Sequence, residues 1–390
     1  MRGTHRMSNR WDAVVVGAGP AGSATALQLA RAGARVLLLD RARFPRDKPC
    51  SEYLSPESTR VLERLGQNVL GAVAAASPAR LTGMKVVAPS GATVVGRFET
   101  FSYALPRTRF DAILRAAAEA AGAEVREGVK VEELIYERGA VAGVVARDTY
   151  RARVVVGADG LRSVVARRLG PVYALGPKRV AFAAHVADVP DVHKLGEMHV
   201  GRPGYVGLGP IGKGVTTVAL VLPLAEARRG KRFFEELNRF PGVAGRFDAT
   251  RIVRQVLATG PFARWSRRAV AAGGGALLVG DAADFFDPFT GQGIYSALRG
   301  AELATAAILT TLATGASLQP YARARRHEFT GKWLLERMIG IAVGWPALIE
   351  RVVGRMIRRP ELADLLVRAT GNCVPARAAL SPRVLAGLVL

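Results

Sequence analysis

A run of valines that stops abruptly at glycine is the feature that most constrains this chain. The segment Val14-Val15-Val16-Gly17-Ala18-Gly19-Pro20-Ala21-Gly22 leads into residues 24–30, whose composition favours a helix. A short β-branched run is typical of a strand buried in a parallel sheet. Glycines let the turn approach a phosphate closely, and the following helix offers free N–H groups to it. The segment therefore predicts a strand–turn–helix unit that binds a nucleotide.

A second strand and an acid complete this unit. Residues 35–39 are mostly apolar and end at Asp40, at roughly the 20-residue spacing expected for a carboxylate that binds ribose hydroxyls. The alternative is an ordinary glycine-rich turn between a strand and a helix. Because strand, turn, helix, strand and acid occur in order, we favour nucleotide binding.

Another glycine-rich motif occurs far along the chain. Apolar residues 276–279 lead to Gly280-Asp281, and Pro288 and Gly291-Gln292-Gly293 precede a helix predicted from Ile294 to about Leu309. A helix N-terminus at this point could stabilise negative charge on a ligand. A glycine-rich loop and a helix without a ligand are the alternative.

Two further segments have related patterns. Valines 154–156 lead to Gly157-Ala158-Asp159-Gly160, which repeats the order of a strand followed by Asp and Gly. Arg107 precedes an alanine-rich helix predicted over residues 111–121, with Gly122 as its stop.

Together these motifs resemble the p-hydroxybenzoate hydroxylase and geranylgeranyl reductase superfamily of FAD-dependent oxidoreductases, over residues 12 to about 310. The resemblance implies an α/β fold. The implied fold has a Rossmann-type FAD-binding domain with a glutathione-reductase-like βαβ start, an inserted antiparallel β-sheet substrate domain and C-terminal helices. It also implies FAD as cofactor and NADH or NADPH as transient reductant. In such proteins the residue matching Asp281 binds the ribityl chain, the amides after Gly291 face the flavin ring, and Asp159 lies in the pyrophosphate region.

The residues expected to bind FAD come from several segments of the chain. They are Gly17, Gly19, Pro20, Ala21 and Gly22; Asp40 and Arg41; Arg46, Lys48 and Cys50; Arg107 and Asp159; and Gly280, Asp281, Pro288, Gly291, Gln292, Gly293 and Ile294. The expected domains are 11–80, 106–177 and 265–330 for FAD, 81–105 and 178–264 for the substrate, and 331–390 as a C-terminal helical segment.

The middle of the chain is expected to form the substrate domain. Short alternating runs such as 179–186 and 214–221 predict antiparallel strands with glycine at the turns. In the superfamily this sheet floors a pocket beside the flavin, and residues 204–210 match the segment against the ring. We expect an apolar substrate, aromatic, polyketide or isoprenoid, either free or linked to a carrier protein or CoA. The histidines have no metal-like spacing, so no metal is expected.

The segment 44–56 follows the second strand, where relatives bring a loop back over the flavin. Geranylgeranyl reductases carry Lys-x-Cys-Gly here, whereas this chain has Lys48-Pro49-Cys50 followed by Ser51. Cys50 could position substrate or relay a proton, and Arg46 and Lys48 could meet phosphates. A buried structural thiol is an equal alternative. The candidate catalytic side chains are Cys50, Tyr53 and Tyr205, with His185 as a further candidate base that the sequence does not rank.

Two reactions compete on this scaffold. In a monooxygenase, NAD(P)H reduces FAD, oxygen forms the C4a-hydroperoxide, and a dry pocket directs the oxygen to an electron-rich ring. In a reductase, reduced flavin gives hydride to an isoprenoid alkene and a nearby acid completes the saturation. Lys48-Pro49-Cys50 favours the reductase. The broader resemblance and Ser51 favour the monooxygenase, which is our main hypothesis.

Flavin-dependent halogenases share the scaffold and form a third candidate. They carry Trp-x-Trp-x-Ile-Pro where this chain has Tyr205-Val206-Gly207-Leu208-Gly209-Pro210, so both tryptophans are absent. Lys85 could be mistaken for a halogenase lysine, but no motif supports it. We do not expect halogenation.

The chain is strongly basic, with a formal net charge of +23 and only eight lysines among its 55 basic residues. The arginines form no long runs interleaved with aromatic residues, so we expect no nucleic-acid partner. A solvated basic surface is favoured over an anionic carrier or membrane as the explanation. Two cysteines are too few for a disulfide framework and fit a reducing cytoplasm. Residues 1–6 are followed by no apolar run, so a signal peptide is not expected.

The C-terminal region predicts amphipathic helices. Apolar residues recur at helical spacing over 334–343 and 348–357, the latter interspersed with arginines. Such helices usually pack on the protein body or cap a pocket, but basic ones also lie on membranes. The alternative to an enzyme is therefore a flavin-binding protein docked on the inner face of the cytoplasmic membrane. The sequence leaves the oligomeric state open.

Overall fold

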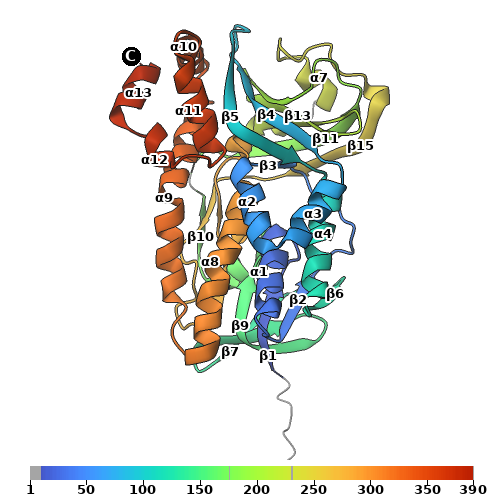
Figure 1. Cartoon of the computed structure of the whole chain (residues 1–390), viewed down its shortest axis with the longest axis vertical. Helices are drawn as coiled ribbons and strands as arrows, with labels where there is room; N and C mark the ends of the chain where they lie inside the picture. The colour runs from blue at the N-terminus through green and yellow to red at the C-terminus, as the bar shows by residue number, and fades with distance from the viewer. Residues whose placement is uncertain (1–9, 175, 230–231, 390) are drawn as a thin grey trace, which may run out of the picture.

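The structure is a computed structural model that describes residues 10–174, 176–229 and 232–389. Residues 1–6, for which no signal peptide is expected, lie outside the described residues. In the view of Figure 1, a mainly parallel sheet occupies the lower half of the molecule and a larger sheet the upper half. The last helices run along one side of both and cover the upper sheet at one end.

The first sheet confirms the predicted βαβ start. Strand β1 (Trp11–Val16), helix α1 (Pro20–Arg31) and strand β2 (Val36–Asp40) follow one another, and β1 pairs in parallel with β2 and with β9 (Thr149–Gly157). The parallel order is completed by β6 (Glu124–Glu127) beside β2 and β17 (Ala276–Leu278) beside β9. Strands β7 (Glu133–Glu137) and β8 (Ala140–Val145) extend β9 as an antiparallel meander. The central valines are almost completely buried, as a strand covered on both faces requires.

The second sheet has eight strands in the order β15-β11-β14-β13-β12-β4-β5-β3. The strands are β3 (Tyr53–Leu54), β4 (Ala79–Val87), β5 (Thr93–Ala104), β11 (Arg179–Ala187), β12 (Leu195–Val200), β13 (Tyr205–Gly212), β14 (Val215–Pro223) and β15 (Ile252–Thr259). Every neighbouring pair is antiparallel, as expected, except β12 and β4, which run parallel. Because the chain passes through the first sheet between β5 and β11, no hairpin forces β12 to run opposite to β4.

Helices connect and cover the two sheets. Helix α4 (Arg107–Ala120) and helix α8 (Gly293–Thr314) pack on α1. Both are longer than expected: α4 begins at Arg107 rather than at residue 111, and α8 continues past Leu309 to Thr314. An ion pair across the first turn of α4, between Arg107 and Asp111, stabilises the earlier start.

The shorter elements connect these parts. They are α2 (Pro56–Leu65), α3 (Gln67–Ala75), α5 (Val164–Leu169), α6 (Leu224–Ala227), α7 (Phe233–Leu237), the 3₁₀ turns η1 (Ala249–Arg251), η2 (Gly280–Ala282) and η3 (Pro288–Thr290), and a small sheet of β10 (Val172–Ala174), β16 (Arg264–Ser266) and β18 (Asp284–Phe285).

The two faces of the eight-stranded sheet have different covers. One face, which carries Tyr205, packs against Ile349, Val353 and Met356 of the C-terminal helices. The other face packs against Phe240 and its neighbours around α7. The C-terminal helices are α9 (Gln319–Ala342), α10 (Pro346–Arg358), α11 (Pro360–Thr370), α12 (Ala376–Ala379) and α13 (Pro382–Val389). Within the described ranges, none of the helices combines the length and the apolar character needed to cross a bilayer.

Candidate functional site

The turn after β1 is packed too closely for side chains. A β-carbon built on Gly22 would lie 1.8 Å from the carbonyl oxygen of Gly17, and one on Gly17 would lie 2.5 Å from the carbonyl oxygen of Ala158. Gly19 is the N-cap of α1 and has no side chain to satisfy the first amides of the helix. Those amides are therefore available to an anionic ligand.

Asp40 lies at the end of β2, and its carboxylate holds the glycine turn in place. One oxygen accepts a hydrogen bond from the Ala18 N–H at 2.7 Å, and the other accepts from the Ala42 N–H at 2.8 Å. An ionised carboxylate has about four acceptor positions, so two remain for ribose hydroxyls. The predicted ribose role is compatible with this geometry and stays a prediction. Arg41, next in the chain, is exposed.

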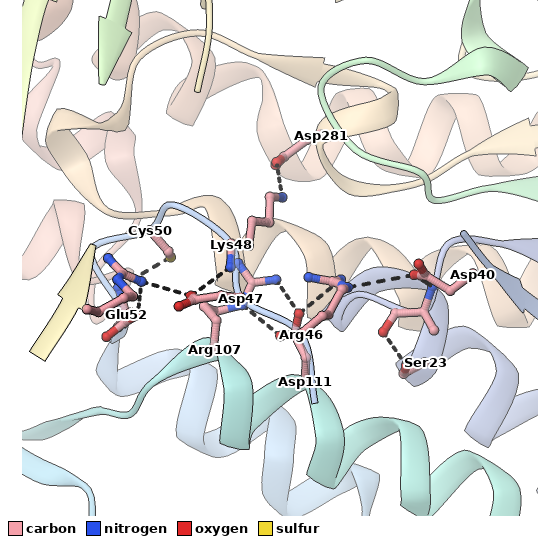
Figure 2. Close-up of polar contacts among 12 residues, drawn as sticks. Ser23, Asp40, Arg46, Asp47, Lys48, Cys50, Glu52, Arg107, Asp111 and Asp281 are labelled. Atoms are coloured by element: carbon pink, nitrogen blue, oxygen red, sulfur yellow. Dashed lines mark hydrogen bonds and ion pairs between the residues drawn. The ribbon is translucent and has the colours of Figure 1, made fainter. Parts of the chain in front are cut away.

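Two arginines face the free end of α1. Arg107 donates two hydrogen bonds to Asp111, at 2.6 and 2.7 Å, and Arg46 Nη2 lies 3.1 Å from the same carboxylate. A β-carbon on Gly19 would lie 3.3 Å from Arg46 Nη2 and 4.0 Å from Arg107 Nη2. Figure 2 shows Arg46 between Asp40 and Asp111. Two guanidiniums beside the amides of a helix N-terminus suit a pyrophosphate.

Lys48 joins the first part of the site to the second motif. Its Nζ lies 3.3 Å from Asp281 Oδ2, and Figure 2 shows the side chain pointing out of its loop toward that carboxylate. The two glycine motifs also touch directly, since a β-carbon on Gly280 would lie 3.0 Å from Ala21 Cβ. The structure thus brings segments far apart in the sequence to one place.

The third motif is close to the same lysine. A β-carbon on Gly160 would lie 3.7 Å from Lys48 Nζ. Asp159 itself accepts hydrogen bonds from Ser163 Oγ at 2.5 Å and from the Val164 N–H at 2.6 Å, which places it at the start of α5. Burial raises the pKa of Asp159 above its ordinary value, although these hydrogen bonds oppose the rise. Its contact with a pyrophosphate stays a prediction.

The second glycine motif forms a tight turn against Tyr53. Gly291 has a φ of +66°, in the left-handed region that favours glycine, and a β-carbon on it would lie 2.8 Å from Tyr53 Cδ1. Helix α8 begins at Gly293 without a side-chain cap. Gln292 is buried, and neither polar atom of its amide has a partner among the described residues. A buried amide without partners is costly, so this turn is suited to receive polar groups of a ligand.

Tyr205 is held by a carboxylate next to this turn. Its hydroxyl donates to Asp287 at 2.6 Å, and Asp287 also accepts from Arg179 at 2.6 Å and from the Phe289 N–H at 3.0 Å. Burial, reinforced by the charge of Asp287, raises the pKa of Tyr205 well above its usual range. This geometry favours a role in positioning the turn over proton transfer.

Glu336 on α9 is an acid beside the same turn that the sequence did not single out. Its Oε1 lies 3.5 Å from Thr290 Oγ1. Burial, together with the nearby charge of Asp284, raises the pKa of Glu336 to about 8. One helical turn earlier, burial lowers the pKa of Lys332 to about 7. In the sequence, Glu336 is a polar position of the amphipathic segment predicted over 334–343, and only its contact with Thr290, 46 residues away, distinguishes it.

Cys50 lies in the loop between the two sheets. Its sulfur accepts a hydrogen bond from the Glu52 N–H at 3.3 Å, and the thiol is a hydrogen-bonding neighbour of Arg107. Burial lowers the pKa of Arg107, but Asp111 and Cys50 outweigh burial, so that pKa lies above its ordinary value. The arginine is therefore a permanent cation beside the sulfur.

A buried ion cluster follows Cys50 directly. The carboxylate of Glu52 lies 2.9 Å from His185 Nε2 and 3.2 Å from Arg254 Nη1. His185, a candidate base in the sequence, is thus paired with a carboxylate between the loop and the second sheet. The sequence did not single out Glu52 or Arg254, because their pairing joins residues 202 apart.

Lys85 lies away from this site. It is paired across the strands with Glu197, whose carboxylate lies 3.0 Å from Lys85 Nζ and accepts from Arg246 at 2.8 Å. Burial opposes ionisation of Glu197, but its hydrogen bonds with His199, Arg246 and Lys85 prevail and lower its pKa to about 2. Lys85 and Glu197 are paired in register with Leu208, on the sheet face opposite Tyr205.

Comparison with known proteins identifies the family of this chain. A family model described as an FAD binding domain matches residues 10–331. The chain belongs to this FAD-binding family. The menaquinone reductase of Mycolicibacterium smegmatis is 30% identical over 400 residues, which cover 94% of this chain and 93% of that protein. The digeranylgeranylglycerophospholipid reductase of Methanosarcina mazei is 32% identical over 329 residues, which cover 79% and 77%.

A solved structure shows the same fold. The flavin-dependent brominase Bmp2 has a TM-score of 0.81 at 22% identity, over 93% of this chain and 94% of that one. The family and the fold confirm the predicted superfamily, the FAD-binding α/β architecture and FAD as cofactor. The glycine turns, the uncapped helix ends and the unpartnered Gln292 amide fit that cofactor.

Proposed function

We propose that the protein is an FAD-dependent reductase that saturates a carbon–carbon double bond in the isoprenoid chain of a lipid or quinone, with NADH or NADPH as the electron source. The observation that carries the proposal is the position of the segment Lys48–Tyr53. Lys48 forms an ion pair with Asp281, and Cys50 is a hydrogen-bonding neighbour of Arg107. The ring of Tyr53 lies directly against Gly291. Similarity to proteins named menaquinone reductase and digeranylgeranylglycerophospholipid reductase supports it.

Different residues would bind the two halves of FAD. The turn Gly17–Gly22, with Asp40, Arg46 and Arg107, would hold the ADP half. Asp281 and the turn Gly291–Gly293 would hold the ribityl chain and the ring. Saturation of a double bond adds a hydride to one carbon and a proton to the other, and bound FAD in its reduced form supplies the hydride.

The chain must supply the proton, and the Cys50 thiol is our candidate donor. The sulfur lies beside the permanent cation Arg107, in the loop that Lys48 places against Asp281. The Thr217 hydroxyl donates to the Cys50 carbonyl oxygen at 3.4 Å and helps to fix the loop. Tyr53 is a poorer donor, since burial raises its pKa far above the ordinary value.

The surroundings of Tyr53 suit an apolar substrate. Tyr53, Phe98 and Val367 form a buried cluster with Met84 and Cys373 packed against it, and the Tyr53 and Phe98 rings are stacked with centroids 6.3 Å apart. These side chains come from the second sheet, from α11 and from the turn that follows α11. An apolar wall next to the Gly291 turn would hold an isoprenoid chain and exclude water.

The monooxygenase is the second candidate, because Ser51 replaces the glycine of the geranylgeranyl reductase motif. One experiment separates the two. The FAD-loaded protein is reduced anaerobically with NADPH or NADH and mixed with a geranylgeranyl lipid or menaquinone. For a reductase we expect reoxidation of the flavin absorbance and a product that has gained two hydrogens. A product that has gained oxygen, formed only in air, would support the monooxygenase instead. A protein that cannot be reconstituted with FAD would contradict both.

The cysteine is tested in the same assay. We expect Cys50→Ser to slow anaerobic saturation about 100-fold, as for the loss of a general acid, while the FAD absorbance stays unchanged. The matched control is Thr149→Ser, a change of similar size at an exposed residue at the start of β9, which should turn over at nearly the wild-type rate. An equal rate in both variants would remove Cys50 from the mechanism.

A further inference from the structure

Helix α9 carries a row of large apolar side chains on its outer surface. We call Leu334, Met338, Ile341 and Trp345 the α9 stripe; they are 50%, 37%, 49% and 64% exposed. The spacing of four and three residues places the first three on one face of α9, and Trp345 follows three residues after the end of that helix, at the N-cap of α10. Figure 1 shows α9 along the outer edge of the molecule. A soluble surface rarely collects apolar side chains of this size in one row.

The exposed charged side chains of α9 are positive. Arg337 lies within the stripe, and Arg323 and Arg326 are exposed on the earlier turns of the same helix. The two carboxylates of α9 point inward: Glu328 accepts from Tyr295 and Arg299, and Glu336 faces Thr290.

The next helix carries a separate group of arginines on an open surface. An open hollow on α10 is lined by Arg351, Arg355 and Arg358, together with Glu350. Glu350 is already engaged, because its carboxylate accepts hydrogen bonds from the backbone and hydroxyl of Ser90. The guanidiniums at the hollow are therefore suited to phosphate groups.

The inner side of α9 contacts the candidate active site. A β-carbon on Gly340 would lie 3.3 Å from Asp287 Cβ, next to the turn that ends at Gly291. Glu336 contacts Thr290 in that turn. A single helix, about 10 Å across with its side chains, therefore separates the α9 stripe from the turn expected to face the flavin ring.

We propose that the α9 stripe docks the protein on the surface of an anionic lipid bilayer, so that a lipid substrate reaches the site around the C-terminal end of α9. The apolar residues would enter the interfacial region, Trp345 would lie at headgroup depth, and the surrounding arginines would contact lipid phosphates. The identity of the lipid as substrate rests on the proposed function, whereas the docking itself does not.

Vesicle binding by the full-length, FAD-loaded protein tests the docking without turnover. We expect co-sedimentation with vesicles of phosphatidylcholine and phosphatidylglycerol, at least tenfold stronger than with phosphatidylcholine alone, and weakened by salt. Bromine-labelled lipid should quench the fluorescence of Trp345, the most exposed tryptophan among the described residues. The variant Trp345→Phe should lose most of that quenching. A wild-type protein that stays in the supernatant would overturn the proposal.

Matched variants locate the surface. We expect Leu334→Asp and Arg337→Glu each to reduce vesicle binding about tenfold. The controls are Val253→Asp, at an apolar residue 58% exposed on β15, and Arg228→Glu, at an exposed arginine after α6; both should bind like wild type. FAD absorbance should be unchanged in all four. An equal loss in the controls would overturn the proposal. The proposal would also be overturned if the protein did not bind vesicles and instead formed a dimer in solution that Leu334→Asp dissociates. The α9 stripe would then bind a second copy of the chain.

The outcome is separable from that of the proposed function. A reductase that does not dock would still saturate a short, detergent-soluble isoprenoid. A docked protein with another chemistry would bind vesicles and leave that substrate unchanged. We expect Leu334→Asp to retain the wild-type rate on the short substrate and to lose at least fivefold on the same isoprenoid presented in vesicles. Equal rates of Leu334→Asp and wild type on vesicle substrate would contradict the route from bilayer to site.

Discussion

Gly22 illustrates how a single position can control cofactor binding. A methyl group there would overlap the Gly17 carbonyl oxygen, 1.8 Å from the β-carbon position, and would push the turn out of shape. We expect Gly22→Ala to cost about 1–3 kcal/mol of unfolding free energy, as for overpacking, and to lower FAD affinity at least tenfold. Urea unfolding and the ratio of flavin to protein absorbance measure the two effects.

The control for this substitution is Gly71→Ala on α3. A β-carbon at Gly71 would meet no atom within 4 Å, so this change should be neutral or stabilise the helix by up to about 1 kcal/mol. If Gly22→Ala retained FAD as well as Gly71→Ala does, the glycine turn would not lie against the cofactor.

Residues whose role depends on local sequence were predictable, and residues whose role depends on distant partners were not. The glycine turns and Asp281 follow from short motifs, because a turn and a helix N-terminus are built from neighbouring residues. Asp287 and Glu52 acquire their roles from Arg179 and Arg254, which lie 108 and 202 residues away. No short pattern encodes such pairs.

At the scale of elements, α9 contributes a titrating group that couples stability to pH. Folding raises the pKa of Glu336 from 4.5 to about 8, so unfolding between pH 5 and 8 releases a proton. Stability should therefore fall as pH rises through this range, by at most about 1.4 kcal/mol per pH unit. Lys332 has the opposite effect, but only above about pH 7, because its pKa is lowered from 10.5 to about 7.

The variant Glu336→Gln isolates this effect. It retains the shape of the side chain and removes its titration, so its unfolding free energy should fall less than that of wild type between pH 5 and 7. Urea unfolding at pH 5, 6 and 7 gives the comparison. Glu132→Gln, at an exposed glutamate, should follow the wild-type curve. Parallel curves for wild type and Glu336→Gln would show that Glu336 ionises in the folded protein as it does in water.

The elements show the same division between local and long-range information. The βαβ start and the strands of the second sheet were predicted from alternation and glycine turns. The parallel pairing of β12 with β4 was not, because it depends on the path of the chain through the first sheet. The early start of α4 at Arg107 is an exception, because its ion pair with Asp111 is local and was missed when the helix was predicted from its alanine-rich part alone.

At the scale of the whole molecule, the loop from Phe44 to Glu52 connects the two sheets and contacts both. It leaves the first sheet after β2, carries Arg46 and Lys48 toward the FAD-binding turns, and ends in the cluster of Glu52 with His185 and Arg254 on the second sheet. FAD binding should therefore stabilise both sheets, because a ligand that holds the loop also holds its anchor.

Glu52→Ala tests this connection. Removing the fully buried carboxylate leaves the largely buried guanidinium of Arg254 without its inner partner, which should cost about 3–5 kcal/mol. Asp47→Ala removes the more exposed partner of the same arginine, 2.9 Å away, and should cost about 1 kcal/mol or less. Calorimetry with and without FAD measures both. Because Glu52 anchors the loop that carries Arg46 and Lys48, added FAD should raise the melting temperature less in Glu52→Ala than in Asp47→Ala. Equal increases in the two variants would mean that the FAD-binding residues keep their positions without the second sheet.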